Sequence, residues 1–230
     1  MERPDLKDVY AVIVAAGSGS RFGSQLPKQF CIMAGKPVLM HTVSRFRQVL
    51  PDENIITVLS PAMEKTWLEM CHEYGFTPAK IVYGGETRWQ SVKNALQTIP
   101  PEAETIMVHD GARPLVSPEL ILRAAFLPSH TEAAVPAIPL TDSIRRLTGG
   151  DTSCHADRAE FVAVQTPQSF RAQLLRRAYA LPYSPDMTDD ASVAEAAGAD
   201  ITLIEGEPSN IKITNPGDIT IAEAMLKAQC

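Results

Sequence analysis

The chain has 230 residues, 45% of them hydrophobic, which is enough for one large α/β domain with a single buried core. Its formal net charge of −6 disfavours a nucleic-acid-binding surface, and no stretch approaches the roughly 20 apolar residues needed to cross a membrane. The start is charged and lacks an apolar signal core, and the four cysteines have no metal-ligand spacing, so we expect a cytoplasmic protein with free thiols.

Apolar, β-rich runs alternate with amphipathic segments along the chain. The runs predict strands at Tyr10–Val14, Ile55–Leu59, Lys80–Val82, Thr105–His109, Ala133–Ile138, Phe161–Val164 and Ile201–Leu203. The segments between them predict helices at Pro37–Val49, Ala62–His72, Thr87–Thr98, Pro118–Phe126, Arg171–Ala180, Asp189–Ala197 and Pro216–Ala228. This alternation predicts an α/β fold in one domain over residues 1–230, with a mostly parallel twisted sheet between two layers of helices. In such sheets, ligands bind beyond the carboxyl ends of the strands.

A glycine-rich loop, AAGSGSRFGSQLPK over residues 15–28, follows the first predicted strand. Successive backbone N–H groups in such a loop form a concavity for phosphate oxygens, and glycine lets the backbone approach them closely. The loop is not a Walker A motif, and Phe22 stands where a dinucleotide fingerprint has its last glycine. Arg21 and Lys28 add two cations, so the polyphosphate of a nucleotide is the expected ligand; an ordinary βα connection is the alternative.

Gly84-Gly85-Glu86-Thr87-Arg88 precedes the third predicted helix, and Ser91 follows within its first turn. Backbone groups at a glycine pair can approach the edge of a base closely, and Thr87 can cap the helix. A capped helix that follows two glycines explains the same residues almost as well.

Asp110 follows the strand Thr105–His109 and faces the N-terminal loop across the expected cleft. A carboxylate there can hold Mg²⁺, or another divalent cation, against phosphate oxygens, because Mg²⁺ takes only one or two protein carboxylates. Arg113 can brace the acid or touch a phosphate. His109 has no His or Glu nearby at metal-binding spacing and is interpreted as a packing residue or as one that supports a site residue from behind. A strand-end aspartate that caps a turn is the competing interpretation of Asp110.

Residues 141–160 interrupt the βα pattern. Gly149-Gly150 lies between two short polar runs, which predicts a β-hairpin. The segment has too little apolar surface to be core, and an isolated two-stranded ribbon is marginal in water. We therefore expect a β-arm that packs against a second subunit in a homodimer; a mobile surface loop is the alternative.

Lys212 lies between two isoleucines near the C-terminus. On a short strand it would face opposite to them, either into the cleft or toward solvent at a sheet edge. Just after it, Asn215 as N-cap, Pro216 and Asp218 predict the start of the last helix.

Five separated motifs occur in a fixed order: Ala15-Ala16-Gly17 with Pro27-Lys28-Gln29-Phe30, His109 to Pro114, Gln165-Thr166-Pro167-Gln168, Thr188 to Ser192, and Asn210 to Thr214. With these motifs the chain resembles, nearly end to end, the 2-C-methyl-D-erythritol 4-phosphate cytidylyltransferases of the non-mevalonate isoprenoid pathway. The resemblance implies a Rossmann-like nucleotidyltransferase fold. It also implies conversion of CTP and 2-C-methyl-D-erythritol 4-phosphate to 4-diphosphocytidyl-2-C-methyl-D-erythritol and pyrophosphate.

The resemblance also implies roles for individual residues. Nucleotide contacts would come from Ala15, Ala16, Gly17, Gly19, Gly85, Glu86, Ser91 and Asp110, with Asp110 also holding the metal. The catalytic cations would be Arg21, Lys28, Lys212 and Arg158, the last reaching from the arm into the neighbouring subunit. The acceptor would meet Arg113, Ser143, Thr166, Thr188 and Thr214, where Ser143 replaces the family's arm threonine.

Three other functions share parts of this pattern. A ribitol 5-phosphate cytidylyltransferase has the same fold and nucleotide loop, but Ala16-Gly17, Gly111-Ala112 and Asp157-Arg158 match the methylerythritol enzymes instead. A nucleotide-sugar pyrophosphorylase usually has a longer chain and a double glycine opening the first loop. A non-catalytic nucleotide-binding regulator would need fewer of the charged residues than this chain carries.

Overall fold

The computed structural model describes residues 6–17, 26–127 and 130–228. Its centre is an eight-stranded sheet with the strand order β10 (Val162–Val164), β7 (Ala133–Pro139), β11 (Gln168–Arg171), β6 (Thr105–Asp110), β1 (Val9–Ala15), β4 (Ile55–Leu59) and β5 (Lys80–Tyr83), while β12 (Ile201–Glu205) also pairs with β7. Six strands run in one direction; β10 and β11 run in the other. The predicted mostly parallel sheet is confirmed.

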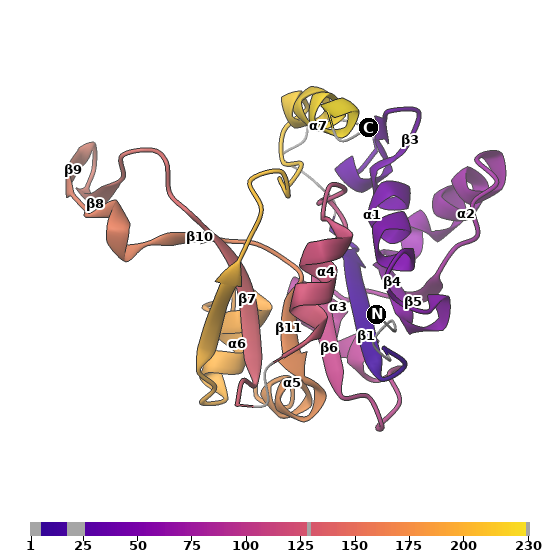
Figure 1. The fold of residues 1–230 in the computed structure, drawn as a ribbon, viewed down its shortest axis with the longest axis horizontal. Coiled ribbons are helices and arrows are strands. Elements are labelled where there is room, and N and C mark those ends of the chain that lie inside the picture. The colour runs from indigo at the N-terminus through magenta and orange to yellow at the C-terminus, as the bar shows by residue number, and fades with distance from the viewer. Residues whose placement is uncertain (1–5, 18–25, 128–129, 229–230) are drawn as a thin grey trace.

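Helices cover both faces of this sheet, as Figure 1 shows. One layer holds α1 (Val38–Arg47), α2 (Glu64–Glu73) and α4 (Pro118–Ala125), and the other holds α3 (Arg88–Leu96), α5 (Ala172–Ala178) and α6 (Asp190–Ala196). Side chains alternate across the central strand β1: Ala11 and Ile13 enter the first core, and Val12 enters the second. Because β1 is buried on both faces, its end is a rigid base for the loop that follows.

A small third layer covers the carboxyl ends of the strands. There α7 (Gly217–Ala228) lies beside the short ribbon β2 (Ile32–Met33) and β3 (Lys36–Pro37), as Figure 1 shows. Ile213, Leu115 and Ala222 form a separate apolar cluster under it. This cluster fixes the segment that carries Lys212 against the end of the sheet.

Each strand and helix that was predicted with stated bounds is present, and its ends lie within two residues of the expected ones. Two expectations fail. Residues 168–170 were assigned to no element and Arg171 to the start of a helix, yet residues 168–171 form β11, which inserts between β6 and β7. The short strand considered around Lys212 does not form; residues 210–214 have no regular secondary structure, although Ile213 N donates to Ala112 O.

The predicted hairpin is confirmed. It consists of β8 (Arg145–Gly149) paired antiparallel with β9 (Thr152–His155), joined through Gly149 and Gly150 with φ of +121° and +52°. These left-handed values require glycine at the turn. The hairpin projects away from the sheet (Figure 1), and every residue of β8 is exposed. Its packing against a second subunit stays a prediction.

The structure also bears on the predictions about the cysteines and about membrane-spanning segments. Cys31, Cys71 and Cys154 carry free thiols, and Cys230 lies outside the described residues. In the described part of the chain, no helix is both long and apolar enough to span a bilayer.

Candidate functional site

A cavity of about 840 Å³ opens at the carboxyl ends of β1 and β6. This volume lies within the usual range for small-molecule sites. The cavity gathers ten of the predicted site residues: Ala15, Ala16, Gly17, Lys28, Gly85, Glu86, Ser91, Asp110, Lys212 and Thr214. Its other lining residues are Val14, Gln29, Thr87, Arg88, Ala112 and Asn215.

One wall is the loop between β5 and α3, packed against the end of β1. Thr87 caps α3 by accepting a hydrogen bond from Gln90 N at 3.0 Å, as predicted. The Ser91 hydroxyl accepts from Gly85 N at 3.2 Å and donates to Thr87 O at 2.9 Å. A Cβ at Gly84 would lie 2.5 Å from Ala16 Cβ, so only glycine lets the two loops approach this closely. The result is a narrow, backbone-lined end of the cavity, suited to a flat base.

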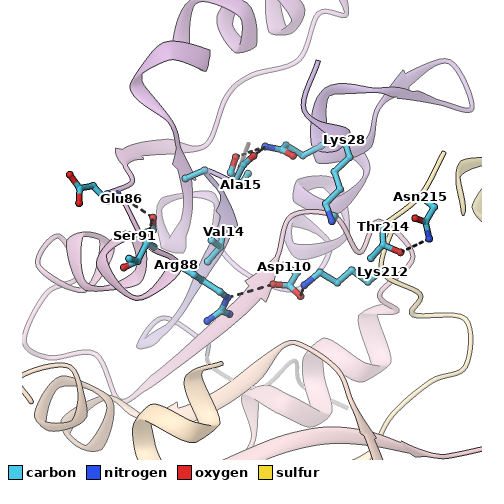
Figure 2. A pocket seen from close by; sticks show the side chains of 16 residues that line it. Val14, Ala15, Lys28, Glu86, Arg88, Ser91, Asp110, Lys212, Thr214 and Asn215 are labelled. Carbon is cyan, nitrogen blue, oxygen red and sulfur yellow. Dashed lines mark hydrogen bonds and ion pairs between the residues drawn. The ribbon is translucent and has the colours of Figure 1, made fainter. Parts of the chain in front are cut away.

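The opposite wall carries Lys28 at the start of the short 3₁₀ helix η2 (Lys28–Phe30). Buried Gln29 donates to Ala15 O at 2.7 Å and to Gly17 O at 2.9 Å, and buried Phe30 packs against Trp67. These contacts tie η2 to the end of β1. Figure 2 shows the Lys28 side chain reaching into the cavity toward Lys212 and Thr214. The two ammonium groups predicted to meet at a triphosphate therefore lie on the same cavity.

Asp110, the last residue of β6, is surrounded by three cations. Its carboxylate lies 2.8 Å from Lys212 Nζ, 3.6 Å from Arg113 Nε and 3.9 Å from Arg88 Nε (Figure 2). Burial alone would raise the pKa of Asp110, but Lys212, Arg88 and Arg113 outweigh it and hold the pKa well below its usual value. Asp110 is therefore ionised near neutral pH.

His109 is a packing residue, as expected. Its ring is fully buried against Phe46, at 4.9 Å between ring centroids. Nδ1 lies 3.0 Å from the Thr166 hydroxyl, and Nε2 lies 3.2 Å from Arg113 O. Burial lowers the pKa of His109 to about 4, so the ring is neutral near pH 7.

Asp110 supplies one carboxylate, an oxygen ligand of the kind that hard divalent cations take. Within residues 6–17, 26–127 and 130–228, no three His, Cys, Asp or Glu side chains gather as a metal-binding group. Asp110 instead offers a single ionised carboxylate at the cavity wall. Mg²⁺ is commonly held by one or two carboxylates, with phosphate and water oxygens filling its other positions.

The remaining predicted site residues do not line the cavity. Thr166 is buried beside Asp110 and accepts a hydrogen bond from its backbone N–H at 3.1 Å. Arg113 lies beneath the acid and donates to Asn210 O. Thr188, Ser143 and Arg158 are exposed and do not contribute to the cavity wall. Arg21 and Gly19 lie outside the described residues.

Two lining residues had no predicted role. Gln29 stands within the Pro27-Lys28-Gln29-Phe30 motif, but its two carbonyl partners are visible only in three dimensions. Arg88 directly follows the capping threonine and reaches both Asp110 and Asp190. The only available sequence signal was a cation at the start of a helix beside the expected base site.

A mostly parallel α/β sheet, a glycine-rich sequence after its first strand, and a cavity at the strand ends that is lined by Lys28, Lys212 and the strand-end carboxylate of Asp110 are typical of a nucleotidyltransferase. The IspD family model, described as 2-C-methyl-D-erythritol 4-phosphate cytidylyltransferase, matches residues 9–228. The chain belongs to this family.

Individual relatives agree with this assignment. The 2-C-methyl-D-erythritol 4-phosphate cytidylyltransferase of Bacteroides fragilis is 44% identical over 94% of this chain and 98% of its own length. Among solved structures, 4-diphosphocytidyl-2C-methyl-D-erythritol synthase of Anaerococcus prevotii has a TM-score of 0.79 at 30% identity, over 97% of this chain and all of its own. The Thermus thermophilus enzyme has a TM-score of 0.73 at 32% identity, over 95% of this chain and 98% of its own.

Proposed function

We propose that this protein converts CTP and 2-C-methyl-D-erythritol 4-phosphate to 4-diphosphocytidyl-2-C-methyl-D-erythritol and pyrophosphate, in isoprenoid precursor biosynthesis. Membership of the family supports this reaction. The observation that carries it is the convergence of Lys28, Lys212 and Asp110 on one cavity whose far end is lined by backbone.

In this proposal the cytosine occupies the narrow end between Ala15–Gly17 and Gly85–Ser91. Backbone groups there can read the edge of a base without intervening side chains. The triphosphate then runs toward Lys28, with Arg21 as a further contact. Lys28 faces this region from a short helix that Gln29 and Phe30 hold in place. Little reorganisation of the protein would therefore be needed for the Lys28 ammonium group to stabilise the negative charge that develops on the phosphates.

The transfer itself needs no general base, because a phosphate monoester oxygen is already ionised near neutral pH. That oxygen attacks the α-phosphorus in line and forms a new P–O bond. The bond from the α-phosphorus to the oxygen that bridges it to the β-phosphorus breaks, and pyrophosphate leaves. Catalysis is positioning and charge stabilisation. Lys212 lies at the opening beside Thr214 and would orient the acceptor phosphate.

Asp110 would hold a divalent cation, with Mg²⁺ as the expected ion. Such a cation, bound with the triphosphate, supplies fixed positive charge next to the reacting oxygens. Asp110 contributes an ionised oxygen at the cavity wall, and Thr166 holds its backbone N–H. The low pKa of Asp110 supports this role, since no proton competes for the carboxylate.

The β-arm would complete the acceptor site of a second subunit in a homodimer. Arg158 and Ser143 belong to the arm and do not line the cavity of their own chain. Leu147 is 79% exposed at the arm, and Phe161, Val162 and Val164 are exposed at its base. Burying these side chains between two copies would favour association.

A pyrophosphate-release assay tests the reaction. CTP, UTP and ATP are each paired with methylerythritol phosphate and with ribitol phosphate, in Mg²⁺ buffer. We expect release with CTP and methylerythritol phosphate only. Release with ribitol phosphate alone would instead identify the ribitol enzyme, and no release with any pair would favour a nucleotide-binding regulator.

A further inference from the structure

The guanidinium of Arg88 lies between two carboxylates from distant parts of the chain. Its Nη2 donates to Asp190 Oδ2 at 2.5 Å, and its Nε lies 3.9 Å from Asp110 Oδ1. Figure 2 shows the side chain extending from the start of α3 across the cavity wall to Asp110. Burial lowers the pKa of Arg88, but the two facing carboxylates outweigh this and raise it above its usual value. Arg88 is therefore a permanent cation.

The Asp190 end of this bridge is rigid. Asp190 is fully buried and also accepts a hydrogen bond from the Tyr179 hydroxyl at 2.6 Å. It is the first residue of α6, where the helix dipole favours an anion. A capping box between Asp189 and Ser192 fixes the start of this helix. These contacts hold the Asp190 carboxylate in place, so it does not move with the Arg88 side chain.

The three cations around Asp110 differ in how firmly they are held. The Lys212 side chain is 41% exposed and ends in a flexible ammonium group at the cavity. If it turns to a substrate phosphate, Asp110 loses its closest counter-ion. Arg113 is held by Asn210 O, and Arg88 by Asp190. Of the cations that line the cavity and face Asp110, only Arg88 has a second, fully buried carboxylate partner in the described structure.

We propose that Arg88 is a positioning residue for Asp110: anchored on Asp190, it holds the Asp110 carboxylate in the orientation that receives the divalent cation after Lys212 has turned to a phosphate. The inference rests on the proposed function. It also gives Asp190 of the Thr188–Ser192 motif a role apart from substrate contact. The competing explanation is that the Arg88–Asp190 pair only stabilises the fold.

Arg88→Lys separates these explanations because it keeps the positive charge and removes the planar fork that spans two carboxylates. A change in cation affinity then reports orientation and not net charge. Asp190→Asn is the second variant. It keeps the shape of the side chain, and Arg88 still has Asp110 as counter-ion, so no buried charge is left unpaired. Released from Asp190, Arg88 would be drawn onto Asp110 and would compete with the metal.

The matched control is Arg176→Lys. Arg176 also holds its guanidinium in fixed hydrogen bonds, to the carbonyls of Leu96, Ile99 and Pro100, and it does not line the cavity. The Arg176→Lys substitution should weaken these hydrogen bonds and lower the melting temperature, and it should leave Asp110 unaffected. Comparing Arg88→Lys with Arg176→Lys therefore removes effects that come from stability alone.

The readout is Mn²⁺ affinity, followed by electron paramagnetic resonance with saturating α,β-methylene-CTP. We expect the Mn²⁺ Kd to rise about tenfold in Arg88→Lys and Asp190→Asn, the size typical for losing an outer partner of a metal ligand. Arg176→Lys should match the wild type. Unchanged Mn²⁺ affinity in a folded Arg88→Lys or Asp190→Asn protein would overturn the proposal. A wild-type enzyme that binds Mn²⁺ but releases no pyrophosphate would instead contradict the proposed reaction.

Discussion

At the scale of single residues, the site depends on Lys28, whose backbone is held in place by its neighbours. Gln29 and Phe30 fix η2 against the end of β1, so Lys28 is preorganised for the charge that develops on the phosphates. We expect Lys28→Ala to lower kcat by about 10²–10³-fold, the usual loss for one preorganised donor. Steady-state pyrophosphate release measures this.

Lys65→Ala is the control for this prediction. Lys65 lies on α2 with its side chain 88% exposed and does not line the cavity. Lys65→Ala removes one positive charge from the protein, as Lys28→Ala does, and its kcat should equal that of the wild type. A Lys28→Ala enzyme within a few-fold of the wild-type kcat would exclude Lys28 from charge stabilisation.

The buried ring of His109 makes stability depend on pH. Burial lowers its pKa in the folded protein from 6.5 to about 4. Between these values the unfolded chain binds the proton and the folded protein does not, so the free energy of unfolding falls as pH falls from 6.5 to 4. A shift of this size corresponds to roughly 3 kcal/mol. Urea unfolding of metal-free protein at several pH values should follow this slope.

His109→Asn removes the titrating ring and should reduce the slope between pH 6.5 and 4; part of the slope should remain, because burial also lowers the pKa of His41. The low pKa of Asp110 places that residue's contribution at still lower pH, so the two effects separate. An unchanged slope in His109→Asn would mean that other groups cause the pH dependence.

At the scale of elements, the nucleotide end of the cavity depends on how closely the β5–α3 loop approaches β1. A Cβ at Gly84 would lie 2.5 Å from Ala16 Cβ and 2.8 Å from the Ser91 hydroxyl. Gly84→Ala must push these two cavity residues apart. Overpacking of this kind costs about 1–3 kcal/mol, so we expect the KM for CTP to rise about tenfold or more.

Gly217→Ala is the matched control for the loop. The added Cβ would meet no atom within 4 Å at the start of α7, so KM should not change. Calorimetry with CTP alone then checks that Gly84→Ala weakens nucleotide binding itself. CTP affinity equal to the wild type would show that the loop gives way without disturbing the base site.

Elements with a strong local signal were predictable from the sequence. The run Ile55–Leu59 is buried at every position and forms β4 with the expected ends. Asp110 could be placed at a strand end because the apolar run Ile106-Met107-Val108 comes shortly before it and Gly111 directly follows it. Both predictions use only residues that are neighbours in the sequence, so they require no knowledge of the tertiary structure.

Features that depend on contacts between distant residues were not predictable. In β11, the residues Gln168 and Ser169 are polar, and the strand exists because it pairs with β6 and β7. The side chain of buried Gln168 donates to the Asp189 carboxylate and accepts from the N–H of Ala191, both at the start of α6. The partnership of Arg88 with Asp190 spans 102 positions in the sequence. Nothing in the local sequence specifies such pairs.

At the scale of the whole molecule, the β-arm of a single chain is left largely exposed to solvent. β8 and β9 extend from the sheet with their side chains mostly exposed, and a lone two-stranded ribbon has little stability in water. In a two-fold dimer each arm would lie on the other subunit. Each complete site would then combine Lys28 of one chain with Arg158 of its neighbour.

Mixing two inactive variants tests this arrangement. In a heterodimer of Arg158→Ala and Lys28→Ala chains, one site would have both residues intact, and the other would lack both. Random exchange makes about half of all dimers mixed, so about a quarter of wild-type turnover should return. Differently tagged chains, purified in sequence, confirm that exchange took place. If Arg158 served its own chain, every site in the mixed dimer would carry one defect, and turnover would stay at the level of the separate variants.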